Sequence, residues 1–176
     1  MDAYSMGRSL GMLVGVGIGV LLAIIALRMM NKDKKVRTEY DEMQQIARGK
    51  GFRIAFYTAM ITEAVLCIAD MGNNLPAEPV VLHFIPIFLG VTVLSVYCIM
   101  KDAFIGLNTR LRFYIILCVF ISLINLATAA AAWKGGDMVV NGLLQAPFVN
   151  FLCGLMFVII GLTGLIKLLK DRREAA

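Results

Sequence analysis

Five apolar runs, each about as long as a membrane-spanning helix, dominate this chain of 176 residues and limit what it can fold into. They lie at about 9–30, 54–75, 79–100, 113–133 and 147–169. A helix needs roughly 20 apolar residues to cross a hydrocarbon core of about 30 Å. Since 60% of the residues are hydrophobic, little sequence remains for a soluble domain. We therefore predict an all-α, polytopic membrane helical bundle with five transmembrane helices, formed by a single integral membrane domain over 1–176.

The lysine and arginine residues lie almost entirely on one side of these runs. Of the 17, all except Arg8 and Lys134 close the first run, occupy the joints 31–53 and 101–112, or lie at the C-terminal end. Loops rich in lysine and arginine stay in the cytoplasm. This pattern predicts an outside N-terminus, an inside C-terminus and a multi-pass protein of a cell membrane, which we expect to be prokaryotic and cytoplasmic. It also assigns the net charge of +5 to contacts with the lipid bilayer, so we expect no nucleic-acid partner.

Glycines recur every four residues in the first predicted helix. Gly7, Gly11, Gly15 and Gly19 are followed at the same step by Ala23, so they share one slowly drifting helix face. A face of such small residues lets another backbone approach closely, which favours helix association in lipid. We predict that this glycine face packs against a sister subunit, another protein or the chain's own helices. The alternative is that glycine is simply common in membrane helices.

The joint 31–51 between the first two runs is the longest polar stretch of the chain. Its apolar residues are spaced four, three and four apart, as on one side of a helix: Val36, Tyr40, Met43 and Ala47. We predict a short amphipathic helix on the cytoplasmic surface, which lies on lipid or docks a partner. Gly49 and Gly51 are expected to end it before the second span. The alternative is a solvated extension of the first helix.

Glu63 is the main candidate for a functional residue inside the membrane. It lies ten residues after Arg53, about 15 Å into the membrane and so near its centre. A bare carboxylate there costs several kcal/mol, so it must be paired, hydrated or protonated. Cys67, Asp70 and Asn74 continue the same helix face towards the outside, at steps of four, three and four. The second predicted helix therefore carries a polar line that points into a bundle or a cavity.

Two residues of other predicted helices are candidate partners for these carboxyl groups. His83 lies near the outer end of the third run at the depth of Asp70, so we predict an Asp70–His83 pair, either as a fixed hydrogen bond or as a pH-sensitive gate. Asn125, about 20 Å along the fourth run, is the expected hydrogen-bond partner of Glu63. Two roles remain open for these four residues: a polar pathway across the membrane, or polar glue between helices.

The sequence lacks signatures of catalysis, cofactor binding and metal binding. A single histidine excludes paired-histidine zinc motifs, and there is no G-x-S-x-G nucleophile elbow and no phosphate-binding loop. The cysteines form no C-x-x-C pair, so we expect them to pack as small apolar residues, with a Cys67–Cys153 bridge left open. We therefore predict that the protein is not an enzyme and holds no cofactor and no metal.

Two functions are consistent with these features. The first is a non-catalytic accessory or interaction subunit that packs through the glycine-rich first helix, as a homo-oligomer or in a larger membrane complex. The second is a small transporter or substrate-capturing subunit, in which Glu63 and the outer Asp70/His83 pair form a path for an unknown small molecule. A path needs a cavity that reaches Glu63, whereas side chains fill that space in a packing subunit.

The charge pattern makes a testable prediction about orientation. In a variant without the native cysteines, a cysteine at Asn73 should react with a membrane-impermeant maleimide in intact cells, because this turn is predicted to lie outside. A cysteine at Lys34 should react only after the membrane is permeabilised. Labelling at Lys34 but not at Asn73 in intact cells would show the opposite orientation.

Overall fold

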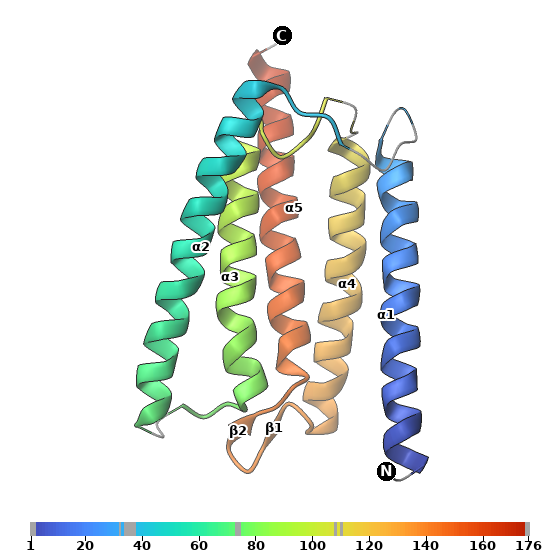
Figure 1. Ribbon diagram of the computed structural model, residues 1–176, viewed down its shortest axis with the longest axis vertical. Helices are drawn as coiled ribbons and strands as arrows, with labels where there is room; N and C mark the ends of the chain where they lie inside the picture. The colour runs from blue at the N-terminus through green and yellow to red at the C-terminus, as the bar shows by residue number, and fades with distance from the viewer. Residues whose placement is uncertain are drawn as a thin grey trace. The chain divides into compact units, whose positions relative to one another are not determined.

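The computed structural model is almost entirely helical (Figure 1). Its elements are α1 (Ala3–Met30), α2 (Glu42–Met71), α3 (Pro79–Met100), α4 (Leu111–Gly135), β1 (Val139–Val140), β2 (Leu143–Leu144) and α5 (Phe148–Glu174). The residues that it describes are 3–31, 33, 38–72, 75–107, 109 and 111–174. In this part of the chain, α2, α3, α4 and α5 are long and apolar enough to cross a membrane. The predicted helical fold is confirmed for these four helices, whereas α1 as a fifth span and the orientation stay predictions.

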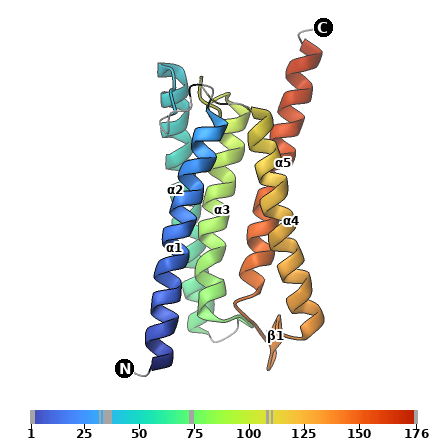
Figure 2. The same ribbon diagram turned by 90° about the vertical axis from the view of Figure 1, so that its right-hand side faces the viewer.

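The chain forms two compact bodies. The α1 body comprises Met1–Glu39 and Gly106–Arg110, and the four-helix body comprises Tyr40–Ile105 and Leu111–Ala176. In the four-helix body α2 packs against α3, α3 against α5, and α5 against α4, which gives the row α2-α3-α5-α4 (Figures 1 and 2). The helix α5 therefore lies between α3 and α4, although those two are consecutive in the chain. Such a row leaves wide apolar helix surfaces uncovered.

The α1 body is held together by contacts beyond the end of α1. Asn31 pairs with Thr109 in an isolated bridge, and the Thr109 hydroxyl donates to Asn31 Oδ1 over 2.7 Å. The Leu107 N–H donates to the Glu39 carbonyl oxygen over 2.9 Å. These contacts fix the chain after α1 against the segment that precedes α4.

Small residues bring α2 and α3 close together. A Cβ added at Gly51 would stand 3.0 Å from Cδ1 of Tyr97, and one added at Gly90 would stand 3.3 Å from the Ala55 carbonyl oxygen and from Cβ of Ala59. These distances leave almost no space for a side chain, so the two backbones approach more closely than larger residues would permit. The same contacts set the register between the two helices.

Glycines likewise line the contact between α4 and α5. A Cβ added at Gly154 would stand 2.7 Å from Cγ of Leu126, and one added at Gly161 would stand 3.4 Å from Cβ of Cys118. Both glycines therefore face α4, and together they form a small-residue face on α5. The buried core of the body lies beside this contact and consists of Ile99, Cys118, Met156 and Ile160.

The separate amphipathic helix predicted in the joint 31–51 is wrong. The helix α2 begins just after Asp41 and continues through Gly49 and Gly51, so this polar stretch extends the second predicted span and not the first. A capping box fixes its start, because Asp41 accepts from the Gln44 N–H over 2.7 Å and the Gln44 side chain accepts from the Asp41 N–H. Glycine costs a helix about 1 kcal/mol, and the packing of Gly51 on α3 offsets that cost. The following residues of the joint lie outside the described residues: 32 and 34–37.

The loop 101–105 after α3 joins three helices at one end of the row. Gln44 of α2 donates from Nε2 to the Asp102 carbonyl oxygen over 2.7 Å, and Arg48 donates to the Ala103 carbonyl oxygen over 3.4 Å. Lys167 of α5 forms an ion pair with the Asp102 carboxylate at 3.0 Å. We call this set of contacts the loop latch, and it ties α2, α3 and α5 together at this end.

A small hairpin closes the opposite end, which we call the hairpin end. The strands β1 and β2 are antiparallel, and their turn residues Asn141 and Gly142 have φ angles of 51° and 79°, as a tight two-residue hairpin requires. The Leu144 N–H donates to the Pro76 carbonyl oxygen over 2.8 Å, and the Glu78 N–H donates to Leu144 O over 2.9 Å. The hairpin is thus tied to the chain between α2 and α3.

The α4–α5 contact predicts that Gly154 tolerates no side chain. Gly154→Ala would place a methyl group against Leu126 and should lower the free energy of unfolding by about 1–3 kcal/mol through overpacking. Gly49→Ala is the matched control, because an added Cβ there meets no described atom within 4 Å, and it should be neutral or slightly stabilising. Thermal unfolding in detergent measures both. Equal stability of the two variants would contradict the close packing.

Candidate functional site

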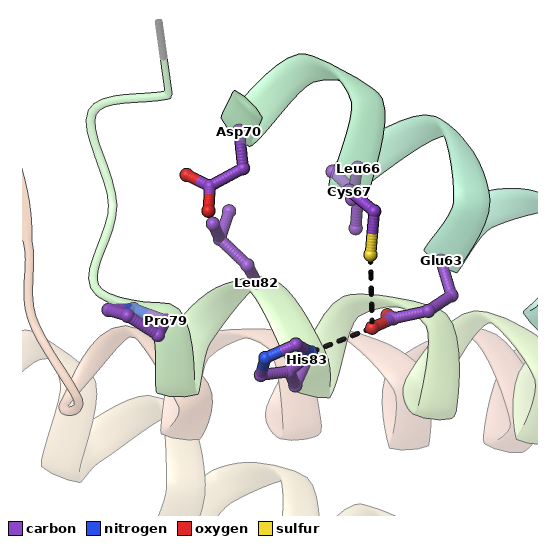
Figure 3. Close-up of a pocket in the computed structure, with 7 residues that line it drawn as sticks. All are labelled: Glu63, Leu66, Cys67, Asp70, Pro79, Leu82 and His83. Carbon is purple, nitrogen blue, oxygen red and sulfur yellow. Dashed lines mark hydrogen bonds and ion pairs between the residues drawn. The ribbon is translucent and has the colours of Figure 1, made fainter. Parts of the chain in front are cut away.

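The part of the polar line that belongs to α2 faces the start of α3 across a small cleft, whereas Asn74 lies outside the described residues. Glu63, Cys67 and Asp70 of α2 line it together with His83 of α3, and Leu66, Pro79 and Leu82 complete its walls (Figure 3). The cleft has a volume of about 30 Å³. Asp70 and Pro79 lie at the hairpin end, and Glu63 lies deeper, about 12 Å along the axis from the end of α2. The site is thus a narrow polar cleft between two helices of membrane-spanning length.

Glu63 and His83 form the central contact of this cleft. His83 Nδ1 and Glu63 Oε1 form a hydrogen bond of 2.8 Å, and the Cys67 thiol approaches the same oxygen at 3.8 Å (Figure 3). The predicted Asp70–His83 pair is therefore wrong, because the imidazole pairs with the carboxylate that lies two turns deeper in α2. The sequence indicates which residues lie near the turn, whereas the packing around Gly90 sets the register of the two helices.

Asn125 is not the partner of Glu63. Its side-chain Nδ2 donates to the Ile121 carbonyl oxygen of its own helix over 2.9 Å. The helix α4 packs against α5, whereas α2 packs against α3 at the other side of the row. The depth of Asn125 along its run could not reveal this, because depth alone does not determine which helices are neighbours.

The Glu63–His83 pair is not enclosed by the four-helix body. The Glu63 side chain is 34% exposed and that of His83 is 64% exposed. Both contacts of Glu63 use Oε1, and His83 uses only Nδ1, so Oε2 and Nε2 have no hydrogen-bond partner among the described residues. In a bilayer the surroundings at this depth are hydrocarbon, where an unsatisfied polar group is costly. The exposed side of this pair therefore requires water, lipid headgroups or another protein surface.

The glycine face of α1 lies in the other body. Among the described residues of the α1 body, no atom lies within 4 Å of a Cβ added at Gly11, Gly15 or Gly19. Gly7 also belongs to α1, but its surroundings lie outside the described residues. The α1 body thus does not itself fill this face, and the packing role of the face stays a prediction.

The cysteines form no disulfide. Cys98 and Cys118 are buried, Cys153 is partly buried and Cys67 is exposed, and all four are free, so the Cys67–Cys153 bridge is not formed. Among the described residues, no group of three or more His, Cys, Asp or Glu side chains has an arrangement that could hold a metal ion.

The fold and the cleft together define the class: a helical chain with four helices able to cross a membrane and a Glu–His pair between two of them. No protein-family model, no curated protein and no solved structure matches it. Chemically, the pair can hold or pass a proton. A cleft of about 30 Å³ has room for a water molecule, and it is far smaller than the roughly 300–1,000 Å³ of pockets for organic ligands.

The Glu63–His83 contact predicts a measurable coupling between the two residues. In a double-mutant cycle with Glu63→Leu and His83→Leu, the coupling free energy should be about 0.6–1.7 kcal/mol, as found for hydrogen bonds between membrane helices. Glu63→Gln should keep most of the stability, because an amide still accepts from Nδ1. Glu63→Leu with Asn125→Leu serves as the control and should be additive. The measurement is thermal stability in detergent. If the effects of the Glu63 and His83 variants were additive, the two side chains would not interact.

Proposed function

We propose that this protein is a non-catalytic membrane subunit, which acts by packing against other membrane helices and not by converting a substrate. One observation carries the proposal. A Glu–His pair at 2.8 Å lies partly exposed on the surface of a body whose helices have membrane-spanning length. In a subunit surrounded only by lipid, such an exposed polar pair would be energetically costly.

The argument rests on the pair and not on the exposed apolar residues. Leucine, isoleucine and phenylalanine side chains face lipid at little cost, so their exposure along the row calls for no partner. A carboxylate and an imidazole in hydrocarbon must instead be covered or hydrated, and such residues almost always face the interior of a helix bundle. The row α2-α3-α5-α4 does not supply that interior for Glu63 and His83. A neighbouring helix from outside the four-helix body would.

The glycine face of α1 supports the same function. Small residues at Gly11, Gly15 and Gly19 offer a surface for close backbone approach, and none of it is used within the α1 body. We propose that α1 is a fifth span with its N-terminus outside, which places the hairpin end outside and the loop latch inside. This orientation leaves only Arg8 and Lys134 outside, as the preference of basic residues for the cytoplasm demands.

One observation favours a second function, a path for protons or a small ion. The cleft reaches Glu63 from the hairpin end and is lined by Asp70, Cys67 and His83, all of which bind protons. Its volume suits water and protons, not an organic substrate. Glu63→Gln separates the two functions, because an amide preserves packing but cannot ionise. Loss of the protein's cellular phenotype with unchanged assembly would favour the path.

The proposed function predicts that bulky residues on the glycine face impair assembly. The double variant Gly11→Leu, Gly15→Leu should lower the mass of the native complex or reduce the amount of protein in the membrane severalfold, because leucine holds helices apart. The matched control is Val20→Leu with Ile24→Leu, two exposed positions on the opposite side of the same helix, and it should behave like the wild type. Native gel migration and membrane abundance are measured. Wild-type behaviour of the glycine variant would show that the glycines are incidental.

A further inference from the structure

The α2–α3 face carries one unused hydrogen-bond donor and one unused acceptor. Glu63 contributes Oε2, and His83 contributes Nε2, since their mutual contact uses only Oε1 and Nδ1. In a pair that is neutral as a unit, whether carboxylate with imidazolium or carboxylic acid with imidazole, one of these two atoms carries a hydrogen and the other accepts. The face is therefore complementary to itself, because the free donor of one copy can bond to the free acceptor of another.

A self-complementary surface of this kind suits a dimer with a two-fold axis. In a symmetric dimer the same patch occurs on both subunits, so that residue i of one contacts residue j of the other and the reverse. If two such faces meet, Nε2–H of each His83 can donate to Oε2 of Glu63 of the partner subunit. The two Glu63 and two His83 side chains then form a closed ring in which each carboxyl oxygen and each ring nitrogen is used, and the ring is neutral when each Glu–His pair is neutral.

We propose that a second copy of this chain docks on the α2–α3 face, with the Glu63–His83 pairs of the two subunits bonded reciprocally across a two-fold axis. This inference rests on the proposed function and names its partner. It requires both residues to be accessible, and both side chains are partly exposed. Asp70, near the end of α2, remains at the aqueous boundary beside the ring.

The position of α2 in the row favours this surface. Of the four helices of membrane-spanning length, α2 is the least buried, and it packs mainly against α3 alone. Its exposed apolar side chains Phe56 and Met60, seven and three residues before Glu63, lie on the same side of α2 and supply further contact area. An unrelated helix would need its own matching donor and acceptor, whereas a second copy supplies both without any additional residue.

Cys67 provides a native probe of the interface. It is the only exposed cysteine of the four, and its thiol lies 3.8 Å from Glu63 Oε1. A short bis-maleimide should therefore link Cys67 to Cys67 of the partner subunit in membranes. The control is Ala131→Cys in a Cys67→Ser background. Ala131 is exposed on α4, four residues from the hairpin end as Cys67 is on α2, and it should not crosslink.

The decisive experiment exchanges the two charges between copies. Glu63→His gives a chain with two imidazoles, and His83→Glu gives one with two carboxylates, so each alone should lose at least tenfold in Cys67 crosslinking. Co-expressed with different tags, the two variants should crosslink to each other severalfold more than either variant does alone. The mixed dimer restores both Glu–His contacts between the subunits, whereas each homodimer restores neither. Failure of the mixture to recover, with both variants folded by thermal unfolding, would overturn the proposal.

Native mass spectrometry of the unmutated protein from lipid nanodiscs provides a test that does not depend on the variants. A dimer is expected. A larger complex in which Cys67 crosslinks to a different protein, or to a cysteine at Val14 of the same chain, would overturn self-docking and leave the proposed function standing. A monomer whose glycine-face variant also behaves like the wild type would overturn both.

Discussion

Close backbone approach through small residues is the interaction on which the four-helix body depends. Glycine packing against α3 keeps α2 helical through Gly51, and glycine packing against Leu126 of α4 lets α5 lie deep in the row. In lipid no hydrophobic effect drives helices together, so such contacts, with a few hydrogen bonds, must provide the association energy. The α2–α3 contact sets the register of these two helices. This register brings Glu63 next to His83, so the position of the polar pair depends on apolar packing.

Much of the fold is predictable from the apolar runs, and the deviations have physical reasons. The run 79–100 coincides with α3, because Pro79 suits the first helical turn and Lys101 ends the apolar stretch. The start of α2 is misplaced because glycine is read as a helix end, whereas packing holds Gly51 inside the helix. The tight hairpin has a local signal, Asn141-Gly142 between apolar residues, that apolar length alone overlooks. The order of the row has no such signal, since helices apolar on all sides do not reveal their buried face.

The site is predictable in its residues but not in its pairs. Glu63, Asp70 and His83 all line one cleft, as expected from their helix face and the short turn between α2 and α3. Which carboxylate meets the imidazole depends on a register that sequence spacing does not contain. Asn125 illustrates the same gap, because equal depth in a membrane places residues in one plane but not side by side. The loop latch is invisible in the sequence, since Gln44 and Lys167 are ordinary polar residues far apart in the chain.

The central place of α5 in the row also bears on how the molecule is made. The helices α3 and α4 leave the ribosome before α5, yet α4 packs mainly against α5, and α3 packs against α2 and α5 and not against α4. The core of Ile99, Cys118, Met156 and Ile160 draws on all three helices, so it closes only after α5 has been made. Until then α3 and α4 are neighbours in the chain without a shared packed surface. Biosynthesis of this protein thus includes an interval in which α3 and α4 have been made but lack the helix that packs between them.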